Sequence, residues 1–291
     1  MVSLIKFKKG KNTYYYLTHH NKTKTKRKYL GKKIPQNIEQ LKQEFLLGFY
    51  RDEWKPTLEK IKQNYLKQRS KKPRAVIDEQ LKDFSILFTF HTNKIEGSTL
   101  TRRDTERLLR DGITPIMKPK SDMVEAEMAQ QVFFEMLKHE KPVSLDTIRY
   151  WHIKMFNQTK LAIAGEIRDY DDITVGNSKA KFPLGSEVFD LLIDLFKWYR
   201  TNKRKINSVE LAGIIHYRLV SIHPFGDGNG RVSRLLMNCI LDEFNYPMLN
   251  IEYSHKYAYY KALETANLKN DETHFLKWFV NYYVSQNARY A

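Results

Sequence analysis

Apolar residues recur at helical spacing over most of the chain after residue 35. Between residues 38 and 68 they lie three or four positions apart, and Pro56 predicts an end or a bend because it cannot donate the helical hydrogen bond. A further helix is predicted over about 76–96, and Thr101 has the side chain of a helix N-cap. The fold class is therefore mainly α, with further helices predicted near 121–138, 144–157, 185–201, 208–222, 230–245, 253–268 and 272–288.

Strand patterns are confined to two places. Near the N-terminus, two aromatic-rich runs flank a polar stretch at residues 20–22, which predicts a small β-hairpin or three short strands. A second, shorter alternation lies at residues 165–177. These patterns divide the chain into a basic, aromatic-rich β region (1–35), a helical linker region (36–75) and a large helical domain (76–291).

The composition is that of a protein with a sizeable core. Of the 291 residues 42% are hydrophobic, and the one cysteine, Cys239, falls on the apolar face of a predicted helix, so we expect a buried, reduced thiol. No apolar run approaches the roughly 18 residues that a membrane span requires, and the first residues lack the features of a signal peptide. We therefore expect a cytoplasmic protein without a membrane partner.

The net charge of +17 is concentrated at one end. Residues 1–35 hold 11 Lys or Arg and no Asp or Glu. Basic charge interleaved with tyrosines is typical of a nucleic-acid contact. An acidic protein surface would suit the same charge equally well, and the tyrosines could instead pack the strands on the helices.

Residues 223–234 contain a glycine-rich turn that leads into a helix. Gly228 and Gly230 allow the backbone to turn sharply, and the N-terminus of the following helix would attract an anion through its free N–H groups and its dipole. Arg231 and Arg234 lie three positions apart and project from one side of the first helical turn. This arrangement is suited to phosphate.

Two further side chains in the same run suit phosphoryl chemistry. Asp227 offers a hard oxygen to Mg²⁺, which usually completes its shell with substrate phosphate. His223 has an ordinary pKa suited to base chemistry near neutral pH, although a histidine here could also simply end a helix. His216, seven residues earlier, is interpreted as a packed, hydrogen-bonded histidine.

The twelve residues from 223, His-Pro-Phe-Gly-Asp-Gly-Asn-Gly-Arg-Val-Ser-Arg, match the signature of the Fic (filamentation induced by cAMP) family, His-Pro-Phe-x-Asp/Glu-Gly-Asn-Gly-Arg-x-x-Arg. The chain resembles this family over about residues 76–285. The resemblance implies a helical bundle with a short β-hairpin flap over the active site. It also implies transfer of a nucleotide monophosphate, usually AMP from ATP, to a hydroxyl of a target protein.

The resemblance also assigns roles within the run. His223 would be the general base, Phe225 a core anchor, and Asp227 the ligand that holds Mg²⁺ against the α- and β-phosphates. The loop would form an anion cradle and the arginines would contact the β- and γ-phosphates, so that the phosphate-binding residues are Gly228, Asn229, Gly230, Arg231 and Arg234.

A second motif lies at the end of the helix predicted at 76–97. Thr92-Asn-Lys-Ile-Glu96-Gly97 resembles the inhibitory helix of the family, Ser/Thr-x-x-x-Glu-Gly/Asn. The resemblance implies that Glu96 forms an ion pair with Arg234, and such a pair would compete with ATP for the arginine. Alternatively, Glu96 is solvated and Gly97 is the residue that follows a helix C-terminus.

Two more segments extend the resemblance. Residues of about 168–183 are similar to the family's flap, where main-chain pairing with a target protein would place its hydroxyl beside the base. Tyr259, Tyr260 and Asn267 lie in a stretch similar to the one that packs on adenine and hydrogen-bonds it. The two tyrosines could instead be ordinary packing aromatics.

The leading hypothesis is an autoinhibited protein adenylyltransferase that modifies a Ser, Thr or Tyr hydroxyl of a target and of itself. A homo-oligomer that dissociates could relieve the inhibition. The alternative at the same site is a deAMPylase in which Glu96 orients water. A third hypothesis is a nucleic-acid-binding regulator that senses a nucleotide, although a sensor would not need the base His223.

Overall fold

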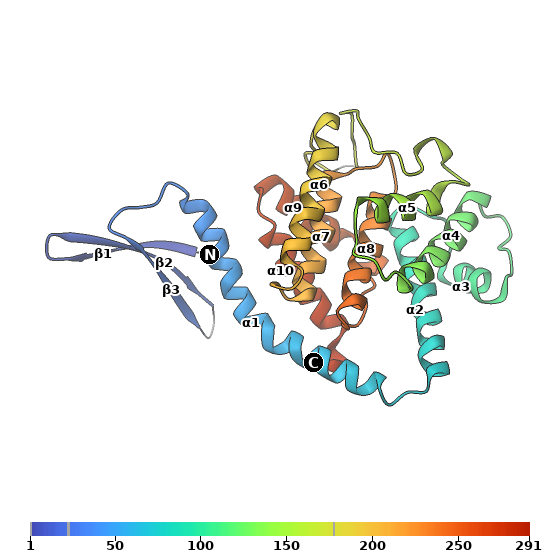
Figure 1. The fold of residues 1–291 in the computed structure, drawn as a ribbon, viewed down its shortest axis with the longest axis horizontal. Helices are drawn as coiled ribbons and strands as arrows, with labels where there is room; N and C mark the ends of the chain where they lie inside the picture. Colours follow the sequence, from blue (N-terminus) through green and yellow to red (C-terminus); the bar gives the residue numbers. More distant parts are fainter. Residues whose placement is uncertain (1, 22–23, 177) are drawn as a thin grey trace. The chain divides into compact units, whose positions relative to one another are not determined.

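The computed structural model describes residues 2–21, 24–176 and 178–291. These residues form ten α-helices and one three-stranded antiparallel sheet (Figure 1). The chain divides into two compact units, Met1–Lys60 and Ile61–Ala291, and the division falls within helix α1 (Ile38–Arg69). The domain boundaries inferred from the sequence, after residues 35 and 75, remain predictions.

The first unit contains the sheet. Its strands lie in the order β1-β2-β3, and the register sets Tyr16 opposite Tyr29. On the other face Leu17 is fully buried, and the His19 ring packs edge-on against Phe49 of α1 at 4.6 Å between centroids. The prediction of strands in residues 1–35 is confirmed for the described residues, with residues 1, 22 and 23 outside them. The strands are β1 (Val2–Lys9), β2 (Asn12–His20) and β3 (Thr25–Gly31).

The second unit is a helical bundle built around two helices. Almost every residue of α7 and α8 is buried. Helix α7 packs against α6, α8 and α10, and α8 packs against α2, α4 and α5 (Figure 1). The turn that joins α7 to α8 is therefore fixed by the centre of the bundle. The helices are α2 (Arg74–Ile95), α3 (Arg102–Asp111), α4 (Lys120–Leu137), α5 (Leu145–Phe156), α6 (Gly185–Asn202), α7 (Ser208–Ile222), α8 (Asn229–Glu243), α9 (Lys256–Lys269) and α10 (Thr273–Gln286).

Local capping explains why the predicted helix ends agree with the structure to within a few residues. Thr101 accepts from the backbone N–H of Asp104, and the Asp104 carboxylate accepts from the N–H of Thr101, so α3 begins with a complete capping box. Ser144 caps α5 in the same way, and the Asn207 side chain caps α7. Each of these helices begins where a short polar side chain satisfies a free N–H group.

Pro56 was predicted to end or bend a helix, and the prediction of an end is wrong. Pro56 lies inside α1, which continues to residue 69. A proline in a helix interior costs about 3 kcal/mol, but it removes only one hydrogen bond. The 32 residues of α1 keep their helical spacing of apolar positions on both sides of the proline.

The single cysteine conforms to expectation. Cys239 is a free, buried thiol, and burial, reinforced by nearby carboxylates, raises its pKa to about 12. It is therefore protonated and unreactive under ordinary conditions. Within the described residues, no helix is both long enough and apolar enough to cross a membrane.

The flap predicted at about 168–183 does not contain the expected β-hairpin. In its described residues, which leave out Asn177, the backbone forms no strand. Side chains of α9 satisfy the backbone instead: Asn267 accepts from the N–H of Lys181 at 2.7 Å and donates to its carbonyl at 2.8 Å. Glu264 accepts from the N–H of Lys179 at 2.5 Å. Because these groups already have partners, a cross-strand ladder is not required.

A buried arginine organises the other end of the flap. The side chain of Arg168 is 3% exposed and donates to backbone carbonyls in three separate segments. Its partners include the carbonyl oxygens of His223 (2.7 Å), Tyr170 (2.7 Å) and Pro183 (2.8 Å). The planar guanidinium thus fixes both ends of the flap to the turn after α7.

Candidate active site

The turn between α7 and α8 has a fixed and uncommon backbone. His223 lies in the left-handed region at φ 53° and ψ 61°, which is costly for a residue with a Cβ, and Gly228 follows at φ 81°. The Asn229 side chain accepts from the N–H of Phe225 at 2.9 Å and donates to its carbonyl at 2.7 Å. Asn229 thus gives the loop its shape, and its direct contact with phosphate remains a prediction.

His223 is held as a neutral imidazole. Its Nδ1 lies 3.3 Å from the carbonyl oxygen of Val220, which can only accept, so Nδ1 carries the proton. Burial lowers the pKa of His223 to about 4, and the nearby positive charge of Arg168 acts in the same direction. The hydrogen bond to Val220 acts in the opposite direction, with a smaller effect than burial. At neutral pH the Nε2 lone pair is therefore available to accept a proton.

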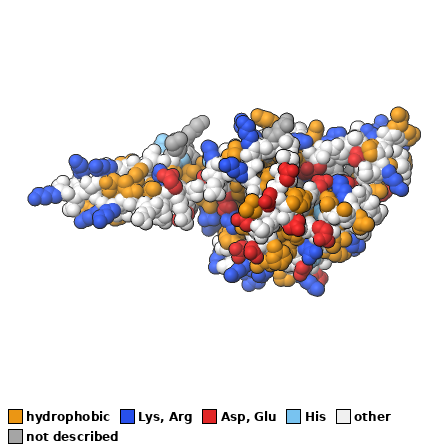
Figure 2. Space-filling view, turned by 90° about the horizontal axis from the view of Figure 1, so that it is seen from above, with side chains coloured by type: hydrophobic (Ala, Val, Ile, Leu, Met, Phe, Trp, Pro, Cys, Tyr) orange, Lys and Arg blue, Asp and Glu red, His pale blue; other side chains and the backbone are white. Residues whose placement is uncertain are grey.

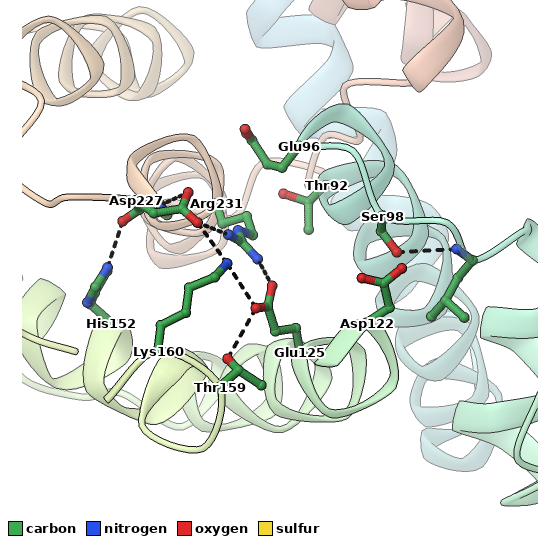
Figure 3. Close-up of polar contacts among 12 residues, drawn as sticks. Thr92, Glu96, Ser98, Asp122, Glu125, His152, Thr159, Lys160, Asp227 and Arg231 are labelled. Carbon is green, nitrogen blue, oxygen red and sulfur yellow. Dashed lines mark hydrogen bonds and ion pairs between the residues drawn. The ribbon is translucent and has the colours of Figure 1, made fainter. Parts of the chain in front are cut away.

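Asp227 lies in a cluster of two cations and two carboxylates (Figure 3). Lys160 donates to Asp227 Oδ2 at 2.7 Å and pairs with Glu125 at 2.9 Å. Arg231 also pairs with both carboxylates, at 3.2 Å in the case of Asp227. Burial alone would raise the pKa of Asp227, but Arg231 and Lys160 lower it to about 2, so the carboxylate is ionised.

The donor set around Asp227 suits Mg²⁺ brought in by a nucleotide. Among the described residues no three His, Cys, Asp or Glu side chains gather into a metal site. A single ionised carboxylate that is 43% exposed is nevertheless what Mg²⁺ needs when phosphates and waters supply its other ligands. Lys160 contacts the same carboxylate oxygen, so it would have to move aside for the ion.

The first turn of α8 leaves room and free donors for an anion. The first intrahelical bond of this helix is donated by the N–H of Val232 to the carbonyl of Gly228 at 3.0 Å. The N–H groups of residues 229–231 are therefore not used within the helix. A Cβ at Gly230 would collide with the side chains of Glu96 and Arg234, so glycine at this position lets their ion pair lie directly against the backbone of α8.

Arg234 is fully enclosed and contacts Thr92 and Glu96 at the end of α2. Its Nη2 donates to Glu96 Oε1 at 2.6 Å, and its Nε donates to Thr92 Oγ1 at 2.7 Å. Burial alone would lower the pKa of Arg234, but the Glu96 carboxylate and nearby tyrosines raise it. Glu96 directly follows α2, and Gly97 has φ 103°, a conformation that favours glycine. The structure thus pairs Glu96 with Arg234 as the resemblance implied.

This geometry agrees with a comparison against protein families, in which the Fic/DOC family model matches residues 142–241. The match covers α7, the turn and most of α8. These residues form a Fic/DOC domain. The helices α5 and α6, which precede the turn, belong to the same domain.

Curated relatives of this Fic domain carry one name. The protein adenylyltransferase fic-1 of Caenorhabditis briggsae is 29% identical over 224 residues, which are 74% of this chain and 43% of that protein. The protein adenylyltransferase Fic of Drosophila ananassae is 30% identical over 183 residues, 61% of this chain and 36% of that protein. The chain therefore spans less than half the length of these relatives.

Solved structures confirm the fold. A Fic domain-containing signaling protein from Bacteroides thetaiotaomicron aligns with a TM-score of 0.71 and 26% identity, covering 79% of this chain and 95% of that one. Fic-1 of C. elegans, residues 134–508, aligns with a TM-score of 0.71 and 24% identity, covering 88% of this chain and 77% of that one. The predominantly helical Fic fold predicted from the sequence is confirmed.

The residues predicted to contact adenine lie in α9, beyond the matched range of the Fic domain. Tyr259 is 1% exposed, and its hydroxyl hydrogen-bonds His216 Nε2 at 2.9 Å. Tyr260 is partly exposed, with Lys256 5.5 Å from its ring centroid. Asn267 is engaged with the flap. Of these three, Tyr260 is the one whose side chain is available, and adenine contact remains a prediction.

His216 is the packed histidine that the sequence led us to expect. It is fully buried, and desolvation lowers its pKa to about 3, so it is neutral. Its ring stacks on Phe275 at 5.5 Å between centroids, and its partner Tyr259 has a pKa that burial raises to about 12. The pair is part of the core.

Sequence reasoning missed another histidine of the Fic domain. His152 of α5 is buried, accepts at Nδ1 from the N–H of Gly165 at 2.8 Å, and donates from Nε2 to the carbonyl of Asp227 at 2.8 Å. Its ring stacks on the fully buried Phe225, the expected core anchor, at 3.9 Å between centroids, and burial lowers its pKa to about 4. It fixes the catalytic loop against the start of the flap. No local motif identifies it.

Proposed function

We propose that the site transfers AMP from ATP to a hydroxyl group of a protein, and that Glu96 restrains the reaction. The observation that carries the proposal is the neutral His223, whose unprotonated nitrogen lies at one end of a turn that opens onto the free N–H groups of α8. The names of the curated relatives, protein adenylyltransferases, support the same reaction.

In the proposed reaction the acceptor oxygen forms a bond to the α-phosphorus of ATP. The bond between that phosphorus and the oxygen bridging to the β-phosphate breaks, and pyrophosphate leaves with the electron pair. The hydroxyl proton passes to His223 Nε2, which is unprotonated at neutral pH because of its lowered pKa. The imidazolium is then charged beside Asp227, which favours the protonated form.

The phosphates would be bound by groups that the fold holds in advance of the reaction. The N–H groups of residues 229–231 and the dipole of α8 suit an anion, and Arg231 and Arg234 add two fixed charges. Asp227 would hold Mg²⁺, which when bound offsets the negative charge of the phosphates. The backbone N–H groups among them are oriented by the helix before binding, and such preorganised donors favour the charge that develops in the transition state.

Inhibition follows from the occupied arginine. Arg234 is paired with the Glu96 carboxylate, and its side chain is 2% exposed. A phosphate could pair with Arg234 only by displacing Glu96, since a carboxylate and a phosphate use the same guanidinium donors. Thr92 holds the arginine in this orientation through the hydroxyl that accepts from Nε.

The test is label transfer from α-³²P-ATP with Mg²⁺ to the protein itself and to a lysate. Wild type, Glu96→Gly, His223→Ala and the double variant are compared. Glu272→Gly is the matched control, because Glu272 pairs with Arg218 at 2.9 Å and is 26% exposed, against 25% for Glu96. We expect strong labelling in Glu96→Gly alone, with the control equal to wild type.

Three results would contradict the proposal in different ways. Equal labelling of wild type and Glu96→Gly would remove the inhibitory role and leave the transferase. No labelling in any variant, with ATP still bound, would remove the transferase. Release of AMP from a previously modified protein by wild type, abolished in Glu96→Gly, would identify the reverse reaction instead.

A further inference from the structure

The small sheet of the first unit has one face that is turned away from α1. In an antiparallel pair, residues opposite each other share a face. The register sets Phe7 opposite Tyr14 and Tyr16 opposite Tyr29. The alternate residues Leu17 and His19 face the other way, where His19 contacts α1. We call the first set the outer sheet face, and its residues are Ile5, Phe7, Tyr14, Tyr16, Arg27 and Tyr29.

The outer sheet face displays aromatic rings to solvent. Phe7 is 55% exposed and Tyr29 is 52% exposed. The Tyr29 ring lies 5.1 Å from Tyr16 and 6.2 Å from Tyr14 between centroids, so the three tyrosines form one platform. Hydrophobic side chains gather along this unit in Figure 2, with Lys and Arg around them. Exposed apolar side chains that gather on one face, with polar residues around them, are typical of an interaction site.

Cations border the platform, and the strands contain no carboxylate. Residues 1–35 carry 11 Lys or Arg and no Asp or Glu. Lys32 Nζ lies 5.9 Å from the Tyr14 ring centroid, and Arg27 is on the outer sheet face opposite Thr18. Asp52 of α1 pairs with Lys26, which is opposite His19 and therefore on the packed face. The charged side chains that the strands place on the outer sheet face are thus positive.

We propose that the outer sheet face binds single-stranded nucleic acid. Unpaired bases stack on aromatic rings, while Lys and Arg beside the rings bind phosphate. In a duplex the faces of the bases are stacked on each other, so a duplex could interact with the Lys and Arg side chains but not with the aromatic rings. An acidic protein would likewise use the cations, but carboxylates do not stack on aromatic rings as unpaired bases do.

The test uses the full-length protein and fluorescence anisotropy. The probes are labelled 20-nucleotide oligo-U and oligo-dT, which separate RNA from DNA, and a 20-base-pair duplex. We expect both single strands, or one of them, to bind about tenfold or more tightly than the duplex. Affinity should fall as salt rises from 50 to 200 mM, since phosphate binding releases counterions.

Variants separate stacking from charge. Tyr29→Leu keeps an apolar side chain but removes the ring, and should weaken single-strand binding about fivefold to a hundredfold with an unchanged salt slope. Tyr29→Phe should bind like wild type. The salt slope is the slope of the logarithm of the binding constant against the logarithm of the salt concentration. In the double variant Arg27→Gln with Lys32→Gln, its magnitude should fall by roughly 0.7 for each phosphate group that the protein no longer neutralises.

An aromatic–cation pair elsewhere on the surface provides the matched control. Tyr150 of α5 is 47% exposed with Lys154 Nζ 5.7 Å from its ring centroid, so Tyr150→Leu with Lys154→Gln should leave binding unchanged. The proposal fails if Tyr29→Leu binds like wild type, or if single strands and duplex bind equally. It also fails if a poly-glutamate peptide displaces the oligonucleotide as readily as unlabelled oligonucleotide does.

Discussion

Lys160 places a positive charge beside Asp227 in the turn between α7 and α8. Its ammonium group contacts Asp227 at 2.7 Å and Glu125 at 2.9 Å, and so neutralises carboxylates that would otherwise repel each other. A divalent ion that binds Asp227 must replace this contact. Lys160 would therefore compete with the proposed Mg²⁺ for the Asp227 carboxylate.

Replacing this lysine should strengthen metal binding. In Lys160→Met the Asp227 carboxylate keeps Arg231 but no longer has the ammonium group beside it, so we expect Mn²⁺ to bind several-fold more tightly in the presence of ATP. Electron paramagnetic resonance of free Mn²⁺ measures this without any turnover. Lys203→Met is the control, because Lys203 makes a similar ion pair with Glu243 at 3.0 Å. Weaker Mn²⁺ binding in Lys160→Met would assign the lysine a supporting role instead.

The limits of sequence reasoning at this scale follow from distance along the chain. His223 and Asp227 belong to one contiguous run, so their chemistry could be predicted together. Lys160 is 67 positions from Asp227 and His152 is 75 positions from it. Nothing local distinguishes that lysine from the many others in the chain. Only the packing of α5 against α8 brings these residues to the loop.

Among the elements, helices were predicted more accurately than the flap for a physical reason. A helix satisfies its own backbone, and residues such as Thr101 mark where it begins. The flap satisfies its backbone through Asn267, 86 positions from Lys181, and through Arg168. Its alternating sequence favoured a hairpin. In the structure, the side chains of Asn267 and Arg168 hydrogen-bond flap backbone groups that a β-hairpin would have paired with each other.

The flap should therefore depend on the shape of one side chain. Arg168→Lys keeps the charge but has too few donors for all of its backbone partners, so buried carbonyls are left without hydrogen bonds at about 1–3 kcal/mol each. We expect a lower free energy of unfolding and faster proteolysis between residues 168 and 183. Urea unfolding and limited trypsinolysis would measure both. An unchanged cleavage pattern would show that Asn267 and Glu264 suffice to hold the flap.

At the scale of the whole molecule, desolvation lowers the pKa of His152, His216 and His223 well below the ordinary value of a histidine. Burial lowers the pKa of His152 and His223 to about 4 and that of His216 to about 3, against an ordinary value of 6.5. The unfolded chain takes up these protons near pH 6.5, whereas the native protein does so only near pH 3 to 4. The unfolded state thus binds more protons below pH 6.5, and stability falls as the pH falls from 6.5 to 4.

His216 offers a clean measurement of this dependence. Each such histidine contributes up to about 1.4 kcal/mol per pH unit well below pH 6.5. In His216→Gln, the free energy of unfolding should therefore depend less steeply on pH. The decrease in slope should correspond to the loss of about one proton from the difference in proton uptake between the unfolded and native states, whatever the variant's absolute stability. Urea denaturation between pH 4 and 7 provides the slope. An equal slope in His216→Gln and in the wild type would contradict the assignment.

If the site binds ATP as proposed, the contact between Glu96 and Arg234 has a consequence for the apparent affinity. The two residues are 138 positions apart in one chain, at the end of α2 and on α8, so the carboxylate has an effective concentration that no dilution of the protein alters. ATP then binds with an apparent affinity set by the fraction of molecules in which Glu96 has released the arginine. A change of about 1.4 kcal/mol in that release equilibrium alters the apparent affinity about tenfold. Under the proposed function, substitutions along the packing of α2 on α8 would therefore change the apparent affinity for ATP without contacting the nucleotide.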